Sequence, residues 1–258
     1  MRFVRFVNGG VPAWGLVEGD TLVPLAGAPW DPAGAAPAGG AALPRRGATL
    51  LPAAAPSKIL CIGRNYRAHA AEMGNEVPKE PLVFFKPPSS VIAHGGTIRL
   101  PKESARVDYE GELALVIGRR ARRVRKEDWR DVVFGVTCAL DVTARDLQKT
   151  DGQWWRAKGF DTFCPLGPAI ETDADPSDLV LETFVDGVRR QNGKTSDFIF
   201  DVGTLVAWTS AAMTLEPGDV ILTGTPEGVG PLAAGQTVEV RISGVGSLSA
   251  AVAVETDA

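Results

Sequence analysis

The sequence predicts a mainly β (α+β) fold. Short alternating or apolar runs recur along the 258-residue chain, and clusters of Gly, Pro, Asn and Asp separate them, which is the pattern of strands joined by turns. Stretches with helical periodicity are few and short. They do not alternate with the strands in the regular order that a doubly wound parallel sheet requires.

Residues 1–56 are predicted to form a small N-terminal accessory domain and its linker. Strands are expected at 3–7, 14–17 and 21–25, because turn-forming residues separate these runs. Residues 26–56 are dominated by Ala, Gly and Pro, which is typical of a linker or a loosely structured region, although the whole chain is rich in these residues. Residues 57–258 form the second, larger predicted domain.

The larger domain is predicted to consist mainly of strands. Asp186-Gly187 is a strong hairpin signal between two short apolar runs. Helices are expected at about 66–73 and at 201–213, and a turn at 216–219 follows the second. The other strands are expected at 58–62, 82–86, 97–100, 109–118, 132–141, 220–222, 238–242 and 248–252.

Composition restricts the class of protein. Hydrophobic residues make up 45% and charged residues 22% of the chain, as in an ordinary soluble globular protein, and the net charge of -4 offers no general basic surface for nucleic acid. The basic run 119–126 is interpreted as a solvated turn. No apolar run is long enough to span a membrane, and the N-terminus lacks the apolar stretch of a signal peptide. Three widely spaced cysteines, Cys61, Cys138 and Cys164, predict buried free thiols in a cytoplasmic protein.

Two glutamates one residue apart, Glu110 and Glu112, are the first candidates for chemistry. Side chains in a strand repeat their direction every second residue, so both carboxylates are expected on one face. Such pairs are common on solvated faces, but this segment runs on into apolar residues, where two like charges need compensation. A hard cation such as magnesium, manganese or calcium would supply it. Asp141, at the end of the next strand, is either a turn aspartate or a third ligand.

His69 and Glu72 are a candidate acid–base pair. Three residues apart on a helix, their side chains can meet, and a carboxylate partner fixes the tautomer of an imidazole and makes it a better base. The alternative is a surface ion pair on an exposed helix. Lys158 lies between aromatic residues and a glycine, where it could stabilise a developing enolate or carboxylate, or lie as an ordinary surface lysine.

Two further local patterns concern loops. Thr143 is expected to cap a helix, with Asp146 completing a capping-box-like pattern. The glycine-rich stretch 222–230 follows a strand, and its backbone amides could bind an oxyanion. It lacks the following helix and the Gly-Lys-Ser/Thr ending of a nucleotide-binding loop.

Six ordered motifs over residues 57–255 resemble the fumarylacetoacetate hydrolase family. The motifs are Gly63-Arg64-Asn65-Tyr66 with His69 and Glu72, Phe85-Lys86-Pro87, Asp108-Tyr109-Glu110-Gly111-Glu112-Leu113-Ala114, Leu140-Asp141-Val142-Thr143-Ala144-Arg145-Asp146, Arg156-Ala157-Lys158-Gly159-Phe160-Asp161 and Thr223-Gly224-Thr225-Pro226-Glu227-Gly228-Val229-Gly230. The resemblance implies a rolled, mostly β catalytic domain of the sandwich or barrel kind, a homodimer, and a divalent metal, usually Mg²⁺, on Glu110, Glu112 and Asp141. The N-terminal segment is similar to the small accessory domain of bacterial short-chain members and lacks the longer N-terminal domain of fumarylacetoacetase.

The resemblance also implies roles for other side chains. His69 and Glu72 would activate water or move a proton from a helix that closes over the substrate, and Lys158 would stabilise developing charge. The implied substrates are small 2-oxo or β-diketo acids that react through a metal-stabilised enolate. The implied substrate contacts are Arg64, Gln148 and Thr225.

Three reactions can proceed through such an enolate. Hydrolysis of an acylpyruvate C–C bond or decarboxylation of oxaloacetate is the favoured prediction, because a His–carboxylate pair can activate water, which isomerisation does not need. The alternative enzyme activity is isomerisation of 2-hydroxyhepta-2,4-diene-1,7-dioate in aromatic catabolism. A non-enzyme alternative is a β-rich binding module with structural calcium, which predicts a sealed metal with His69 and Lys158 far away.

Overall fold

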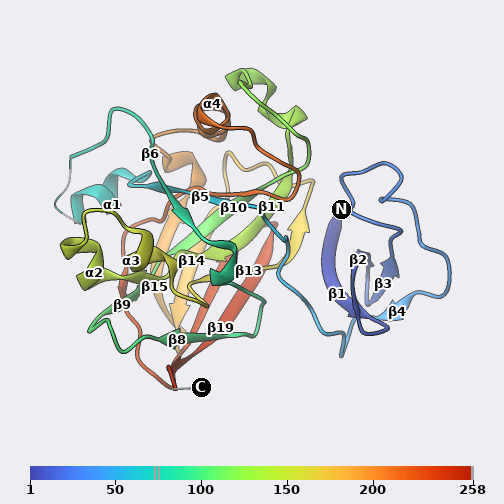
Figure 1. Ribbon diagram of the computed structural model, residues 1–258, viewed down its shortest axis with the longest axis horizontal. Coiled ribbons are helices and arrows are strands. Elements are labelled where there is room, and N and C mark those ends of the chain that lie inside the picture. Colours follow the sequence, from blue (N-terminus) through green and yellow to red (C-terminus); the bar gives the residue numbers. More distant parts are fainter. Residues whose placement is uncertain (73, 75, 257–258) are drawn as a thin grey trace.

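The computed structural model describes residues 1–72, 74 and 76–256, and it has the mainly β architecture that the sequence predicts (Figure 1). Three sheets and a few short helices form the body of the molecule. The N-terminal strands lie at one side, drawn in blue. Helices α1 (Arg67–Glu72), α2 (Arg145–Thr150) and α3 (Trp155–Gly159) gather at the opposite side. Met73, the last residue of the predicted first helix, lies outside the described residues.

The largest sheet continues from the N-terminal strands into the main body. β1 pairs antiparallel with β13, and the order then follows β11, β10, β16, β5 and β6. Within this path the described pairs are antiparallel except for β16 with β5. In sheet order, the strands are β4 (Leu43–Pro44), β3 (Thr21–Pro24), β2 (Val11–Glu18), β1 (Arg2–Asn8), β13 (Cys164–Glu171), β11 (Val133–Leu140), β10 (Gly111–Ile117), β16 (Val220–Leu222), β5 (Ile59–Gly63) and β6 (Leu82–Lys86), with β7 (Val91–Ile92) joining β13 off the path.

Two smaller sheets complete the body. The five-stranded sheet contains the predicted hairpin, whose turn residues Asp186 and Gly187 both have positive φ, at 50° and 76°. Its order is β15 (Val188–Lys194), β14 (Val180–Val185), β18 (Thr237–Ile242), β19 (Gly246–Val254) and β8 (Thr97–Leu100). The three-stranded sheet has the order β12 (Thr143–Ala144), β9 (Val107–Tyr109) and β17 (Gly230–Pro231).

Strand β10 is buried on both faces. Leu113 and Leu115 join the core that lies against the five-stranded sheet, whereas Ala114 and Val116 join a second core cluster on the other face. This explains the continuous apolar run, because neither face of the strand meets water. Glu112 has the same parity as Ala114 and is buried near the start of the strand.

The predicted strand 109–118 is interrupted at Glu110. The residues before it belong to β9, which pairs with β12 and β17, whereas β10 begins at Gly111 and pairs with β11 and β16. The chain therefore changes sheets at Glu110. The prediction of a single strand was wrong, because pairing with distant partners, and not local propensity, determines where β9 ends.

The predicted helix cap at Thr143 is also wrong. Thr143 lies in β12 and donates to the backbone oxygen of Asp141 at 3.0 Å, and α2 begins only at Arg145. The Asp146 carboxylate accepts instead from the hydroxyl and backbone groups of residues 104 and 105, at 2.6 and 2.7 Å. The backbone of Thr143 pairs with β9 and the side chain of Asp146 binds the segment before β9, and a local pattern contains neither contact.

Part of the segment 26–56 is packed rather than loose. Ala53 and Ala54 are buried in the second core cluster, and Trp30 stacks edge-on against Trp14 and Phe134. Most of residues 36–49, by contrast, are exposed, as the composition predicts. The domain division at residue 56 stays a prediction.

The remaining helical elements include α4 (Val202–Ala212), which confirms the helix predicted at 201–213 and begins after the capping side chain of Asp201. Arg120, Arg125 and Lys126 of the basic run form exposed ion pairs with Glu216, Asp128 and Asp201, in agreement with the predicted solvated turn. Cys61, Cys138 and Cys164 are buried free thiols. No helix among the described residues is long and apolar enough to cross a membrane. The described residues also include short 3₁₀ helices at Pro88–Ser90, Lys126–Asp131 and Thr195–Asp197.

Candidate active site

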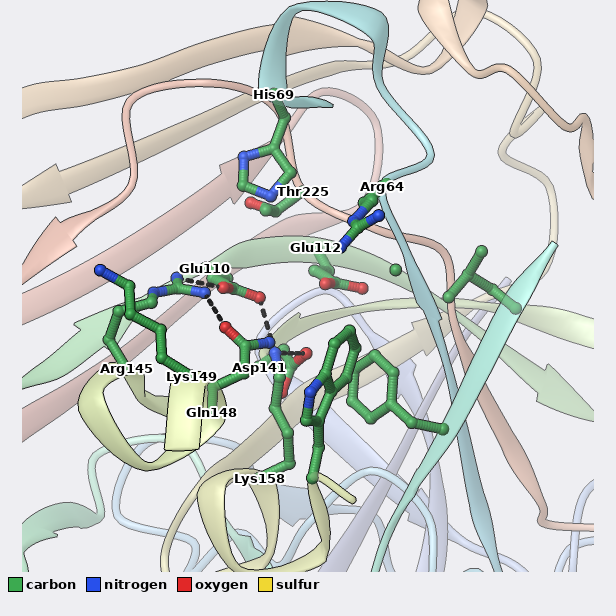
Figure 2. Close-up of a pocket in the computed structure, with 14 residues that line it drawn as sticks. Arg64, His69, Glu110, Glu112, Asp141, Arg145, Gln148, Lys149, Lys158 and Thr225 are labelled. Atoms are coloured by element: carbon green, nitrogen blue, oxygen red, sulfur yellow. Dashed lines mark hydrogen bonds and ion pairs between the residues drawn. The ribbon is translucent and has the colours of Figure 1, made fainter. Parts of the chain in front are cut away.

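Glu110, Glu112 and Asp141 meet where β10 and β11 pair. Gly111 lies opposite Leu140, so Glu110 and Asp141 are each the next residue beyond the paired strands. The Asp141 backbone N–H donates to the Glu110 backbone oxygen at 2.8 Å. Glu112 follows two residues later and points to the same face. One oxygen from each carboxylate lies within 4.8 Å of the others, and all three side chains are buried. The predicted three-carboxylate cluster is therefore present (Figure 2).

Lysines neutralise two of the three acids. Lys158 from α3 donates to Glu110 Oε2 at 2.9 Å and to Asp141 Oδ2 at 2.6 Å. Lys86, at the end of β6, donates to the other Asp141 oxygen at 2.6 Å. Lys158 is only 2% exposed, so the reading of a surface lysine does not hold.

Arg145 holds the remaining side of Glu110. Its guanidinium pairs with Glu110 Oε1 and donates to Asp108 Oδ2 at 2.9 Å and to Gln148 Oε1 at 2.6 Å. Because the Gln148 oxygen accepts from Arg145, its NH₂ group is the part that remains for other partners. Arg145 therefore orients both a candidate metal ligand and a candidate substrate contact.

The two neighbouring glutamates have opposite electrostatics. Burial alone would raise the pKa of Glu110, but Lys158 and Arg145 outweigh it and hold the pKa well below its usual range. Burial, followed by repulsion from Asp141 and Glu110, raises the pKa of Glu112 well above its usual value. Burial opposes the charge of Lys158, yet Asp141 and Glu110 raise its pKa, so it stays an ammonium. The cluster is therefore short of positive charge at Glu112.

This deficit fits a divalent cation. Within the described part of the chain, no cation is ion-paired with Glu112, and its one hydrogen bond comes from the Gly224 backbone N–H at 2.7 Å. Three buried carboxylates offer the hard oxygen donors that Mg²⁺, Mn²⁺ and Ca²⁺ prefer. The donor set thus matches the predicted metal.

A cavity of about 270 Å³ opens over the cluster. Figure 2 shows His69 on the wall opposite the acids, with Arg64 to one side and Lys149 to the other. The structure thus brings the predicted His69 and Lys158 to one open cavity, which disagrees with a sealed structural calcium site. The lining residues are Ile62, Gly63, Arg64, His69, Phe84, Glu110, Glu112, Asp141, Arg145, Gln148, Lys149, Trp154, Lys158 and Thr225.

Glu72 does not line the cavity but contacts His69 from behind. The distance from His69 Nδ1 to Glu72 Oε2 is 3.4 Å. Glu72 also accepts from the Gly228 backbone N–H, at 3.0 and 3.2 Å to its two oxygens. His69 itself is buried, so the reading of an exposed surface ion pair does not hold. The glycine-rich loop does bind oxyanions, and here they are the protein's own carboxylates.

Thr225 lines the cavity, but its hydroxyl is occupied. It donates to the Gly111 backbone oxygen at 2.8 Å and accepts from Gln191 Nε2 at 2.8 Å. The substrate-contact role assigned to Thr225 stays a prediction, and a contact through its hydroxyl proton would require that bond to break.

Four charged residues of the site were not assigned a role from the sequence: Lys86, Asp108, Arg145 and Lys149. Three of them lie inside the motifs that carry the family resemblance. A charged residue within an otherwise buried run was therefore the signal that could have identified them. Lys149 follows Gln148 directly and had no signal of its own. The partners of Lys86, Asp108 and Arg145 are up to 55 residues away in the sequence, and no local pattern could supply them.

Comparison with known proteins places both segments of the chain. Residues 58–253 match the family model described as fumarylacetoacetate (FAA) hydrolase C-terminal, and residues 1–52 match the model described as Rv2993c-like, N-terminal. The mitochondrial oxaloacetate tautomerase FAHD1 of Arabidopsis thaliana is 50% identical over 195 residues, which is 73% of this chain and 87% of that protein.

Solved structures share the whole fold. The 5-carboxymethyl-2-hydroxymuconate delta-isomerase of Mycobacterium smegmatis is 44% identical, with a TM-score of 0.91 over 99% of this chain and 100% of that chain. The maleylpyruvate hydrolase of Sphingobium sp. SYK-6, solved with manganese(II) and pyruvate, is 34% identical, with a TM-score of 0.82 over 99% and 100% of the two chains.

Proposed function

The chain belongs to the fumarylacetoacetate hydrolase family, and from this premise we propose that it is a metal-dependent enzyme that moves a proton between C3 and the 2-oxo oxygen of a small 2-oxo dicarboxylic acid, with oxaloacetate tautomerisation as the first candidate reaction. One observation carries the proposal. A buried three-carboxylate cluster and a His–Glu pair occupy facing walls of one cavity. A proton acceptor on one wall and a charge-stabilising centre on the other are what such a transfer needs.

The chain's residues would hold the metal through Glu110, Glu112 and Asp141. A divalent cation there, Mg²⁺ first and Mn²⁺ or Ca²⁺ as alternatives, would supply Lewis-acid stabilisation of the negative charge that develops on the 2-oxo acid. The manganese and pyruvate in the Sphingobium hydrolase support this choice of metal and of a 2-oxo acid.

His69 is proposed to exchange the proton at C3. The Glu72 carboxylate on Nδ1 would hold that nitrogen protonated and leave Nε2 as the base. Lys158, kept charged by its two acids, would donate a hydrogen bond to the oxygen that gains negative charge. The NH₂ group of Gln148 and the guanidinium of Arg64 would contact substrate oxygens.

Two cations support a dicarboxylic substrate. Among the described residues, Arg64 and Lys149 line the cavity without a hydrogen-bond or ion-pair partner, in contrast to Arg145 and Lys158. Arg64 also has a positive φ of 59°, an unfavourable conformation for a residue with a long side chain that the surrounding fold must hold in place. One substrate carboxylate at the metal, on the side of Arg64, and a second at Lys149, on the other side of the cavity, would satisfy both cations.

Hydrolysis of an acylpyruvate C–C bond is the second candidate function. The His69–Glu72 pair favours it, because the same base that takes a proton from carbon can take one from water. Oxaloacetate decarboxylation and isomerisation of 2-hydroxyhepta-2,4-diene-1,7-dioate use the same charge stabilisation. The homodimer implied by the family resemblance stays a prediction.

A substrate panel tests the proposed function. The protein, with and without Mg²⁺, is given oxaloacetate, acetylpyruvate and a 2-hydroxymuconate-type dienoate, and tautomerisation is followed by enol absorbance while pyruvate and acetate report cleavage. We expect oxaloacetate tautomerisation to have the highest kcat/KM and to require the metal. Pyruvate and acetate release from acetylpyruvate at a higher kcat/KM would favour the hydrolase, and full activity in the presence of EDTA would refute the metal mechanism.

Lys149→Met is expected to lower kcat/KM for the dicarboxylate oxaloacetate about tenfold or more, because an ion pair to the second carboxylate is worth about 1.5–3 kcal/mol. For the monocarboxylate acetylpyruvate the change should be less than about twofold. Arg67→Met is the matched control, since Arg67 lies on the exposed side of α1 and does not line the cavity. Equal losses on both substrates would show that Lys149 does not read the second carboxylate.

Metal binding is expected to release protons. Because burial and its acidic neighbours raise the pKa of Glu112, the metal-free protein holds a proton there at pH values below that raised pKa. The cation and this proton compete, so affinity for Mg²⁺ should rise with pH until Glu112 is ionised in the free protein. Isothermal titration calorimetry in two buffers of different ionisation enthalpy measures the release. A pH-independent affinity with no proton release would contradict the assignment of Glu112 as a ligand.

A further inference from the structure

Gln191 is a buried amide outside the cavity, and all of its polar atoms are engaged. It lies on β15 in the five-stranded sheet and is 1% exposed. Its Oε1 accepts from the Gly111 backbone N–H at 2.9 Å. Its Nε2 donates to Thr225 Oγ1 at 2.8 Å and to the Pro226 oxygen at 2.9 Å. Each N–H of the amide and its oxygen therefore has a partner.

These three bonds join two segments that carry the site. Gly111 is the residue between the candidate ligands Glu110 and Glu112. Thr225 and Pro226 belong to the loop 223–228, and the Thr225 hydroxyl donates back to the Gly111 oxygen at 2.8 Å. The side chain of Gln191 thus closes a ring of hydrogen bonds between the ligand turn and the loop.

The loop 223–228 in turn donates hydrogen bonds to one carboxylate of the three-carboxylate cluster and to the carboxylate that contacts His69. The Gly224 N–H donates to Glu112 Oε2 at 2.7 Å, and the Gly228 N–H donates to Glu72, the partner of His69. Gly224 and Gly228 lie four residues apart on the same loop. The position of this loop therefore sets where the metal cluster and the base stand relative to each other.

Close packing leaves the loop little freedom to shift. A Cβ at Gly111 would lie 2.1 Å from Thr183 Oγ1, and a Cβ at Gly228 would lie 2.1 Å from the Arg190 oxygen, on the residue before Gln191. The Tyr109 hydroxyl also donates to the Gly228 oxygen at 2.9 Å. Both ends of the connection are thus packed against the strands that carry Gln191 and its neighbours.

We infer that Gln191 is a positioning residue. Through Gly111 and the loop 223–228, it fixes the position of Glu112 relative to the His69–Glu72 pair. The inference rests on the proposed function for its kinetic readout only. Polar groups one step behind metal ligands alter metal affinity or activity by about tenfold to a hundredfold when they are removed. Gln191 acts on a candidate ligand and on the candidate base at once.

The test compares Gln191→Met with Asn192→Met. Asn192 is the next residue on β15 and is exposed, so the control makes the same change of amide to thioether on the opposite face of the strand. In Gln191→Met we expect the Kd for Mg²⁺ to rise about tenfold, kcat to fall about tenfold or more, and peptides covering 223–228 to lose protection from amide hydrogen exchange. Asn192→Met should stay within about twofold of the parent in Kd and kcat.

A purely structural role for Gln191 would lower the melting temperature without these changes. Wild-type Kd, kcat and loop exchange in folded Gln191→Met would therefore overturn the inference. If that variant fails to fold, Gln191→Glu retains an acceptor for the Gly111 N–H but has no N–H for the loop, and unchanged exchange at 223–228 would overturn it equally. If the parent turns over no 2-oxo acid, the proposed function fails, while Mg²⁺ affinity and exchange still decide the role of Gln191.

Discussion

Glu112→Gln is expected to raise the melting temperature of the metal-free protein, whereas Glu110→Gln is expected to lower it. The pKa of Glu112 is raised by burial and acidic neighbours, so its stabilising contribution is full below the usual carboxyl pKa and is lost as the pH rises through the raised value. At higher pH the ionised Glu112 side chain destabilises the fold, and the neutral amide of Glu112→Gln removes this destabilisation. Its oxygen can still accept from the Gly224 N–H.

Glu110 has the opposite balance because its charge is already paired. Its pKa is held low by Lys158 and Arg145, so it stabilises the fold above the usual carboxyl pKa, and that stability is lost only as the pH falls through the lowered value. Glu110→Gln removes one buried carboxylate partner from each cation, while Lys158 keeps Asp141 and Arg145 keeps Asp108. Removal of one partner from a buried ion pair costs up to about 3–5 kcal/mol, so we expect a clear loss of stability. Thermal unfolding of the two variants in EDTA at neutral pH measures the difference.

Both variants should lose Mg²⁺-dependent activity by about a hundredfold or more, since Lewis-acid stabilisation contributes several kcal/mol. The addition of Mg²⁺ should raise the melting temperature of the parent protein and not that of either variant. Asp178→Asn, an exposed carboxylate distant in sequence from the cluster, is the control for a simple change of net charge. If the two glutamine variants shift stability in the same direction, the electrostatic account of the cluster is wrong.

His69→Gln is expected to lower kcat by about 10²–10⁴-fold, the usual contribution of a positioned acid–base group. The Kd for Mg²⁺ should stay within about twofold of the parent value, because His69 lies on the wall opposite the acids and is not one of the cluster's ligands. Steady-state kinetics and calorimetry on the same preparation separate the two effects.

His94→Gln is the matched control, because the chain has only these two histidines. The Nδ1 of His94 accepts from the Ser249 backbone N–H at 3.1 Å, and His94 does not line the cavity. Its variant should retain the kcat of the parent within about threefold. Full activity of His69→Gln would remove the His–Glu pair from the mechanism and leave Lys158 as the remaining candidate for proton transfer.

The sequence predicted the parts of the site that depend on strand geometry. The two-residue period placed Glu110 and Glu112 together, and the end of the apolar run 132–141 placed Asp141 at the rim of the sheet. The helix spacing of His69 and Glu72 was likewise enough to predict their contact. These relations are local, so a few dihedral angles determine them.

The charged residues around the cluster could not be predicted in the same way. Lys86 reaches Asp141 across 55 residues and Arg145 reaches Glu110 across 35, and no periodicity connects such pairs. Gln191 lies in a strand whose other long side chains are exposed, so its sequence context resembles a solvated edge. The break at Glu110 depends on which strands pair with each half of the segment. Tertiary pairing decides these features.

The double contact of Lys158 has a consequence for the life of the protein. Its ammonium already neutralises Glu110 and Asp141, so the chain can reach its final fold before any metal ion arrives. Acquisition of the ion then becomes a step that follows synthesis and folding, and one that can be reversed without unfolding. Under the proposed metal mechanism, a shortage of magnesium or manganese would therefore leave the polypeptide folded but inactive, and the return of the ion would restore its activity.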